Sequence, residues 1–268
     1  MSNILKYLCA VLISLVIIII LALGVTYSSH DIPVLNYHQI NDTDFDALTL
    51  SSSEFAAQMK DLYEEGYTTL TPDQLLADLH GNNLPAKPVL ITFDDGYEDN
   101  YRNAYPILEK YHFNATIFLI SNLVGQDHYL NWNEIKDMQQ HQITFEGHTF
   151  SHPFLSKETD ENVLKKELLD SKQDLENHLG YRIDYLAYPY GDYNAHVMEE
   201  VQKYGYRAAF TVHLGDDTTK DNPYALPRVP IFQSYTHTFL RFWLSLHFPT
   251  LMNDIQTEKL RLFAQHEN

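Results

Sequence analysis

Cysteine is almost absent from this sequence. The single residue, Cys9, lies in an apolar N-terminal run, so the 268-residue chain can form no internal disulfide. Because the remaining residues include no cysteine, a disulfide scaffold and thiol catalysis are excluded for them. Any metal site in it must use histidine and carboxylate ligands.

Basic residues are also scarce. The chain has 18 Lys and Arg against 36 Asp and Glu, a formal net charge of -18. Such a surface repels a phosphate backbone, so we expect no nucleic-acid partner. The charge suits a neutral or cationic substrate, although simple solubility would explain it too.

Low-complexity linkers and internal repeats are missing, which excludes solenoids and propellers. With 44% hydrophobic and 20% charged residues, the chain can bury a sizeable core. We expect one folded domain over residues 29–268, preceded by an N-terminal segment over residues 1–28.

One long hydrophobic run is present, residues 7–25, and it carries no charge. At about 1.5 Å per helical residue it roughly matches a ~30 Å hydrocarbon core. Lys6 precedes the run and Asp31 follows it, which predicts a single-pass anchor in the cell membrane with the domain outside the cytoplasm. A cleaved signal peptide is the alternative, but its apolar region usually has only about 7–15 residues.

Beyond the anchor, apolar runs of strand length alternate with segments of helical period, which predicts a parallel α/β fold. Seven runs are candidate strands, a number that suggests a barrel: Val34–His38, Val89–Phe93, Ala115–Ile120, Ile143–Gly147, Tyr185–Pro189, Arg207–Thr211 and Pro227–Phe232.

Capping boxes predict helix starts at Ser51, Thr71 and Asn131. Apolar residues recur at helical spacing and are expected to face the sheet: Phe55, Met59, Leu62, Tyr63, Leu164, Leu168, Leu175 and Leu179. The aromatic segment Thr236–Phe248 is expected to form a last helix packed on the barrel, with contact to a membrane surface or a partner as the alternative.

Two adjacent acids, Asp94 and Asp95, follow a buried-looking strand and precede Gly96. The carboxyl ends of parallel strands are where α/β folds place their sites. Burying both carboxylates is costly unless a cation compensates. A solvated turn in which one acid caps the next helix is the alternative.

Two histidines, His148 and His152, follow another candidate strand at a spacing of four residues. Side chains at this spacing can meet one ion on a helical turn. Two histidines and one carboxylate form the three-ligand set of a catalytic zinc or related site. If Asp95 completes that set, Asp94 is free to act as a general base.

The motifs TFDDG, HTFSH and AYPYG, in this order, resemble the first three motifs of the polysaccharide deacetylases. The resemblance covers roughly residues 32–231. It implies a distorted (β/α)7 barrel, a catalytic domain over residues 29–268, and hydrolysis of N-acetyl groups on glycans. The implied cofactor is a divalent metal, zinc first, with cobalt, nickel or iron as alternatives.

Residue by residue, the resemblance makes Asp94 the base and Asp95, His148 and His152 the metal ligands. It also implies that a backbone N–H near Tyr190, in the third motif, stabilises the oxyanion.

Two departures from the family pattern stand out. Ala187 occupies the position of the motif arginine that orients the base, and the usual C-terminal histidine motif of the general acid has no clean match. In both departures the sequence resembles the biofilm poly-β-1,6-N-acetylglucosamine N-deacetylases, which are circularly permuted. That branch implies His38, at the end of the first strand, as general acid; a structural histidine is the alternative.

Two further residues are candidates around the site. Trp132 resembles a tryptophan that this branch places along the site wall, and it could stack on a sugar; a core tryptophan is the alternative. Arg228, at the end of the last candidate strand, is the leading replacement for the missing arginine, with a surface salt bridge as the alternative.

The expected substrate is an extracellular N-acetylglucosamine polymer, poly-β-1,6-N-acetylglucosamine first, with exopolysaccharide synthesis machinery as a partner that this branch suggests. Deacetylation of peptidoglycan or a chitin-type glycan with the same residues is the alternative within enzymes. From another class, the protein could be a non-catalytic, membrane-tethered glycan-binding module. The intact set of Asp94, Asp95, His148 and His152 argues against that module, because binding needs no base beside a metal site.

Overall fold

The computed structural model of the chain describes residues 14, 32–44, 48–78, 84–212, 222–231 and 238–247. The chain divides into two compact units, one of residues 1–31 with 243–268 and the other of residues 32–242. The predicted anchor, residues 7–25, lies outside the described residues apart from Ser14. In the described ranges, no helix combines the length and apolar character needed to cross a bilayer.

The larger unit is built on a parallel sheet in the order β10-β1-β5-β6-β7-β8-β9, with β4 paired to β5. Leu226, which precedes β10, forms a parallel bridge with Phe210 at the opposite end of the sheet. The sheet is therefore strongly curved, and the parallel half-barrel that it forms confirms the predicted distorted (β/α)7 barrel in part. The strands are β1 Val34–Tyr37, β2 Gln39–Ile40, β3 Thr49–Leu50, β4 Thr68–Thr69, β5 Pro88–Phe93, β6 Ala115–Leu119, β7 Ile143–Gly147, β8 Tyr185–Ala187, β9 Ala208–Phe210 and β10 Val229–Pro230.

All seven predicted strands are confirmed: four are shorter by one or two residues, the last is shorter by four, one is identical and one is a residue longer. The strand predicted to reach Pro189 ends at Ala187, because Pro189 begins a 3-10 turn that runs to Gly191. The two-residue strands β2, β3 and β4 were not predicted, since they are too short to show an alternating pattern.

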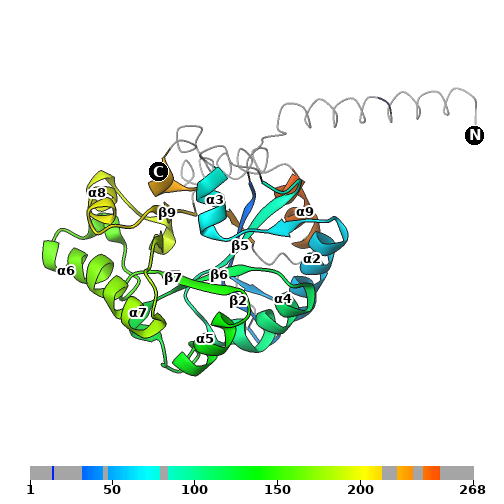
Figure 1. Cartoon of the computed structure of the whole chain (residues 1–268), viewed down its shortest axis with the longest axis horizontal. Helices are drawn as coiled ribbons and strands as arrows, with labels where there is room; N and C mark the ends of the chain where they lie inside the picture. The colour runs from blue at the N-terminus through cyan, green and yellow to red at the C-terminus, as the bar shows by residue number, and fades with distance from the viewer. Residues whose placement is uncertain are drawn as a thin grey trace, which may run out of the picture. The chain divides into compact units, whose positions relative to one another are not determined.

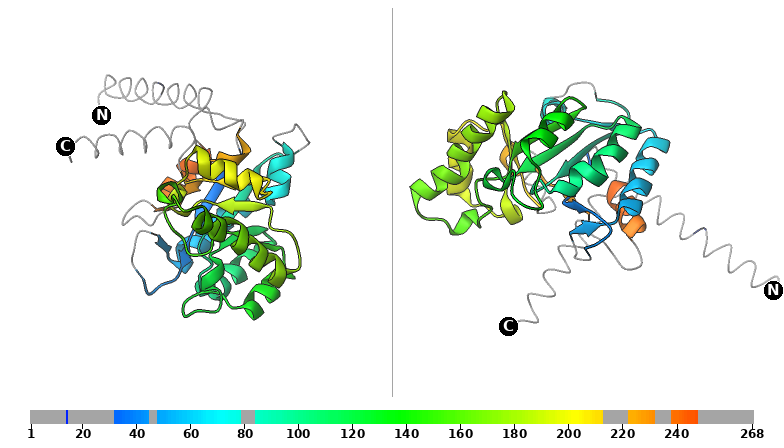
Figure 2. Two further views of the ribbon diagram at one scale, coloured as in Figure 1. Left: turned by 90° about the vertical axis from the view of Figure 1, so that its left-hand side faces the viewer. Right: turned by 90° about the horizontal axis from the view of Figure 1, so that it is seen from below.

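The helices lie outside the strands, as the views of Figures 1 and 2 show. The three predicted helix starts are confirmed by hydrogen bonds to the side chains of Ser51, Thr71 and Asn131. The helices are α2 Ser52–Glu64, α3 Pro72–Asp78, α4 Tyr105–Tyr111, α5 Trp132–Gln139, α6 Glu161–Lys165, α7 Ser171–Leu179, α8 Ala195–Lys203 and α9 Thr238–His247.

The predicted apolar stripes are buried with one exception. Tyr63 is 59% exposed, because the core-facing side of α2 is already filled by Phe55, Met59 and Leu62. The aromatic segment predicted as a last helix is helical over Thr238–His247, and its residues 236, 237 and 248 lie outside the described residues.

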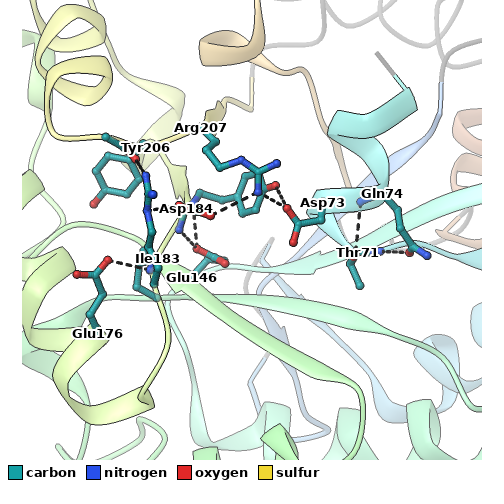
Figure 3. A network of polar contacts seen from close by, with 12 residues as sticks. Thr71, Asp73, Gln74, Glu146, Glu176, Ile183, Asp184, Tyr206 and Arg207 are labelled. Carbon is teal, nitrogen blue, oxygen red and sulfur yellow. Dashed lines mark hydrogen bonds and ion pairs between the residues drawn. The ribbon is translucent and has the colours of Figure 1, made fainter. Parts of the chain in front are cut away.

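A polar network joins distant parts of the chain at the amino-terminal ends of β8 and β9 (Figure 3). Arg207 forms ion pairs with Asp73 of α3 and with Asp184. The Tyr185 hydroxyl donates a hydrogen bond of 2.7 Å to Asp73, across 112 residues of sequence. These contacts hold α3 against β8 and β9 and leave the carboxyl ends of the strands free for the site.

Candidate metal centre and catalytic site

The structure brings Asp95, His148 and His152 together at the carboxyl ends of β5 and β7. The Nε2 atoms of His148 and His152 each lie 3.4 Å from Asp95 Oδ1. One ligand atom from each residue falls within 4.8 Å of the others. Asp95 Oδ1 is buried and has no hydrogen-bond partner among the described residues.

This arrangement fits a divalent cation. Imidazole nitrogen and carboxylate oxygen bind zinc at about 2.0–2.2 Å, so two ligand atoms of a tetrahedral site lie about 3.3–3.5 Å apart. The observed separations of 3.4 Å have that length. An ion would also compensate the unpaired buried oxygen of Asp95. The ligand set alone does not distinguish zinc from cobalt, nickel or iron.

The backbone around the metal trio is strained. Asp95, Thr149, His152 and Tyr190 all have positive φ, between 58° and 71°. Each such non-glycine residue costs about 1–2 kcal/mol, and such outliers gather at functional sites. Gly96 continues the turn at φ 76°, and a side chain there would meet the Leu119 Cδ2 atom at 2.6 Å.

The two histidines differ in how readily they offer a neutral nitrogen to a cation. His148 Nδ1 lies 2.7 Å from the backbone oxygen of Ala187, which as acceptor requires the Nδ1–H tautomer and leaves Nε2 free toward Asp95. Burial lowers the pKa of His148, but the charges of Asp94 and Asp95 raise it above its usual value overall. Burial and the neighbouring His148 lower the pKa of His152 to about 4, so its imidazole is neutral at pH 7.

The carboxylate of Asp94 accepts hydrogen bonds from two buried side chains. The Arg228 guanidinium donates to Oδ1 at 2.7 Å and to Oδ2 at 2.6 Å, and Asn36 Nδ2 donates to Oδ2 at 2.9 Å. Asp94 and Arg228 are 2% and 1% exposed. The surface salt bridge that was the alternative for Arg228 is therefore wrong, because both partners are buried.

These donors keep Asp94 ionised. Burial raises the pKa of Asp94, but the charge and hydrogen bonds of Arg228, together with the charges of His148 and His38, outweigh burial and hold that pKa well below its usual range. Oδ1 accepts one of the three hydrogen bonds and Oδ2 accepts two. A carboxylate oxygen has two lone pairs, so Oδ1 retains one for a further proton or donor.

His38 lies at the end of β1, on the same edge of the sheet, and is partly exposed. Burial lowers the pKa of His38 below its usual value, although the charges of Asp94 and Asp95 oppose the shift. The Asn100 side chain donates a hydrogen bond of 2.8 Å to the backbone oxygen of His38. His38 is thus electrostatically coupled to both acids.

The two aromatic candidates have different surroundings. The Tyr190 ring meets the His152 ring edge to face at 4.5 Å, and its side chain is half exposed. The Trp132 indole stacks on His178 of α7 at 4.1 Å, and among the described residues no contact joins it to the metal trio. The role of Trp132 beside a sugar stays a prediction.

Two residues that support the site were not predicted from the sequence. Asn36 is fully buried within β1, and a polar residue inside the apolar run VLNY was the signal for it. Glu167 is buried in a π-helical turn and accepts hydrogen bonds from the backbone N–H groups of Phe150 and Ser151 at 2.9 and 2.8 Å. It holds the loop between the two histidines, and nothing in its helical surroundings pointed to that role.

Known proteins resemble this chain over most of its length. The polysaccharide deacetylase family model matches residues 81–209. YxkH of Bacillus subtilis (strain 168), a protein named as a polysaccharide deacetylase, is 39% identical over 201 residues, which are 75% of this chain and 71% of YxkH. A poly-β-1,6-N-acetyl-D-glucosamine N-deacetylase of Staphylococcus aureus (strain MRSA252) is 28% identical over 248 residues, 82% of this chain and 86% of that protein.

The fold is shared as well. The structure of the Streptococcus pyogenes deacetylase PplD, in complex with acetate, superimposes with a TM-score of 0.71 at 32% identity, over 75% of this chain and 92% of PplD. Because sequence identity, family model and fold agree across most of the larger unit, the chain belongs to the polysaccharide deacetylase family, a family of hydrolases.

Proposed function

We propose that this polysaccharide deacetylase removes acetyl groups from poly-β-1,6-N-acetylglucosamine and releases acetate. The buried trio of Asp95, His148 and His152 beside the ionised Asp94 is the observation that carries the deacetylase chemistry. The Staphylococcus aureus relative, which is named for this polymer and aligned over 82% of the chain, supports the substrate.

Asp95, His148 and His152 would hold the divalent cation, with zinc as our first choice. When bound, such a cation supplies Lewis acidity toward the acetamide carbonyl and lowers the pKa of water. Asp94 then takes the proton of the attacking water on Oδ1, the oxygen with a free lone pair. Arg228 and Asn36 orient the carboxylate, so it is both ionised and fixed before the substrate arrives.

Departure of the amine needs a proton, because an amine anion cannot leave at neutral pH. His38 donates that proton from the end of β1 in its protonated form, which the charges of Asp94 and Asp95 favour against the effect of burial. A backbone N–H near Tyr190 stabilises the oxyanion, an interaction whose loss typically raises the barrier by about 2.7–4 kcal/mol.

Residues 7–25 anchor the enzyme in the cell membrane, with the catalytic domain outside the cytoplasm, where a polymer leaving the exopolysaccharide synthesis machinery would meet it. An uncharged run of this length between Lys6 and Asp31 supports the anchor.

Acetate release from purified poly-β-1,6-N-acetylglucosamine, with and without a chelator, tests the proposal. We expect release that the chelator abolishes and that the divalent cation restores. Asp94→Asn should lose release while it retains the metal, whereas His148→Ala should lose the metal itself. Peptidoglycan and chitin oligomers, assayed in parallel, identify the polymer.

Several outcomes would contradict these assignments. Turnover by Asp94→Asn at the wild-type rate would remove Asp94 as the base. If His38→Ala releases acetate at the wild-type rate and keeps the alkaline limb of the pH–rate profile, His38 is not the general acid. Release from peptidoglycan or chitin alone would leave the chemistry intact and overturn the proposed polymer.

A further inference from the structure

Two large aromatic side chains are exposed side by side next to the metal trio. Phe154 is 44% exposed and Tyr190 is 52% exposed. Their rings stack with centroids 4.1 Å apart and an angle of 11° between the planes. Contiguous exposed apolar surface is unfavourable in water, and where it persists it commonly marks a binding site.

This aromatic pair begins at a metal ligand. The Tyr190 ring contacts the His152 ring at 4.5 Å, and Phe154 follows His152 by two residues. The pair therefore extends outward from the proposed site of acetyl removal. Lys157 places its ammonium 4.2 Å from the centre of the Phe154 ring and adds a hydrogen-bond donor at the outer edge.

The two segments that carry the pair are tied together before any ligand binds. The Asp192 carboxylate accepts hydrogen bonds from the backbone N–H of Ser156 at 2.7 Å and from its hydroxyl at 2.6 Å. Gly191 lies at φ 67°, and a side chain there would meet backbone and side-chain atoms of Val212 at 2.8 Å or less. A preorganised surface of this kind loses little entropy when it binds.

Another aromatic pair near the site is less suited to a ligand. Tyr97 and Tyr129 stack at 5.2 Å, but both are only partly exposed, and an antiparallel backbone bridge joins them. The rings of Tyr63 on α2 and Tyr111 on α4 contact each other at 5.2 Å with their planes tilted by 39°. Tyr63 is exposed and forms no described contact with the trio, which makes it a matched control.

We propose that Phe154 and Tyr190 form a sugar subsite for the polymer unit next to the one being deacetylated. The inference rests on the proposed function and adds to it how a polymer, rather than a single sugar, is held. The apolar face of a pyranose ring packs on the aromatic pair, while its hydroxyls remain in water. Lys157 donates to an oxygen of that unit and repels a unit that already carries a protonated amine, so the subsite selects an acetylated neighbour.

The test compares kcat/KM on β-1,6-linked N-acetylglucosamine oligomers of one to five units for wild type, Phe154→Ala, Phe154→Trp and Tyr63→Ala. We expect Phe154→Ala to lose about tenfold more on the pentamer than on the monomer, chiefly through KM. Phe154→Trp should restore the dependence on length, and Tyr63→Ala should match wild type throughout.

Equal losses by Phe154→Ala on all lengths would overturn the subsite, because the residue would then only support the histidine loop. The same holds if Phe154→Ala equals wild type, or if Tyr63→Ala reproduces its losses. If the wild-type protein hydrolyses only β-1,4 oligomers, the proposed polymer is wrong. The subsite is then tested by whether the loss of kcat/KM in Phe154→Ala grows with the length of those β-1,4 oligomers.

Discussion

The carboxylate of Asp94 receives three hydrogen bonds, two from Arg228 and one from Asn36. A buried aspartate without such partners would be protonated more readily, because burial favours the neutral form. Here the guanidinium is the largest of the contributions that oppose burial, and with His148 and His38 it holds the pKa of Asp94 below its usual value. Arg228, directly before β10, thus supplies the partner that Ala187 cannot supply from the third motif.

Replacing Arg228 should show this dependence. In Arg228→Met the buried carboxylate loses its partner, and the free energy of unfolding should fall by about 3–5 kcal/mol. Ionised Asp94 stabilises the native fold above the pKa it has in the unfolded chain, and this stabilisation is lost as the pH falls through its lower folded pKa. Without Arg228 that folded pKa rises, so the acid limb of kcat/KM should move to higher pH.

Urea unfolding at several pH values and a pH–rate profile measure these changes. Arg182→Met is the matched control, because Arg182 pairs with Asp184 and its side chain is 62% exposed. An exposed pair contributes at most about 1 kcal/mol. An acid limb that stays in place in Arg228→Met would show that Arg228 does not set the charge of Asp94.

At the scale of elements, the loop from His148 to His152 depends on a helix that contributes no ligand. Glu167 lies in the π-helical turn between α6 and α7 and accepts hydrogen bonds from the N–H groups of Phe150 and Ser151. Its other oxygen accepts the Ser151 hydroxyl at 2.6 Å. These bonds offset the strain of the positive φ at Thr149 and His152.

Glu167→Ala should therefore weaken metal binding without removing a ligand. Loss of groups that orient ligands typically lowers metal affinity about 10–100-fold. Titration of the metal-free protein with Zn²⁺ or Co²⁺ measures the effect. Glu161→Ala is the control, because Glu161 on α6 is 62% exposed and pairs only with the exposed His196 among the described residues. Unchanged affinity in Glu167→Ala would make the glutamate merely structural.

At the scale of the whole molecule, the site draws on strands from both ends of the larger unit. The family model covers residues 81–209, yet His38 directly follows β1 before that range and Arg228 directly precedes β10 after it. Because β1 pairs with both β5 and β10, Arg228 reaches Asp94 after β5, and His38 lies at the same edge of the sheet. The sheet order, rather than the order of motifs along the chain, completes the site.

The proposed membrane anchor is also tested on the whole chain. We expect the full-length protein to sediment with membranes, to resist carbonate extraction and to keep its intact amino terminus by mass spectrometry. A charge at the centre of the run costs about 2.5–3.5 kcal/mol of insertion free energy. Ile18→Arg should therefore shift protein into the soluble fraction, whereas Ile18→Leu should not. A released protein that lacks the run would show a signal peptide instead.

Much of the fold and the metal trio could be predicted from the sequence because their signals are local. Apolar runs, capping boxes and the spacing of His148 and His152 each lie within a few residues, and the fold confirms the strands and helix starts that they predict. Short strands such as β2 were not predicted, because two residues are too few to show a pattern. The exposure of Tyr63 was not predicted either, because its helical spacing is ambiguous between the core and the surface.

The sequence by itself therefore determined the class of fold, the ligand trio and the chemistry that such a trio supports. Only the tertiary structure decided that Arg228 and Asn36 hold Asp94, across 134 and 58 residues of sequence. It also decided that Glu167 supports the histidine loop and that Phe154 stacks on Tyr190. Such contacts depend on how the sheet curves and which strands become neighbours, and no local pattern of residue types encodes that geometry.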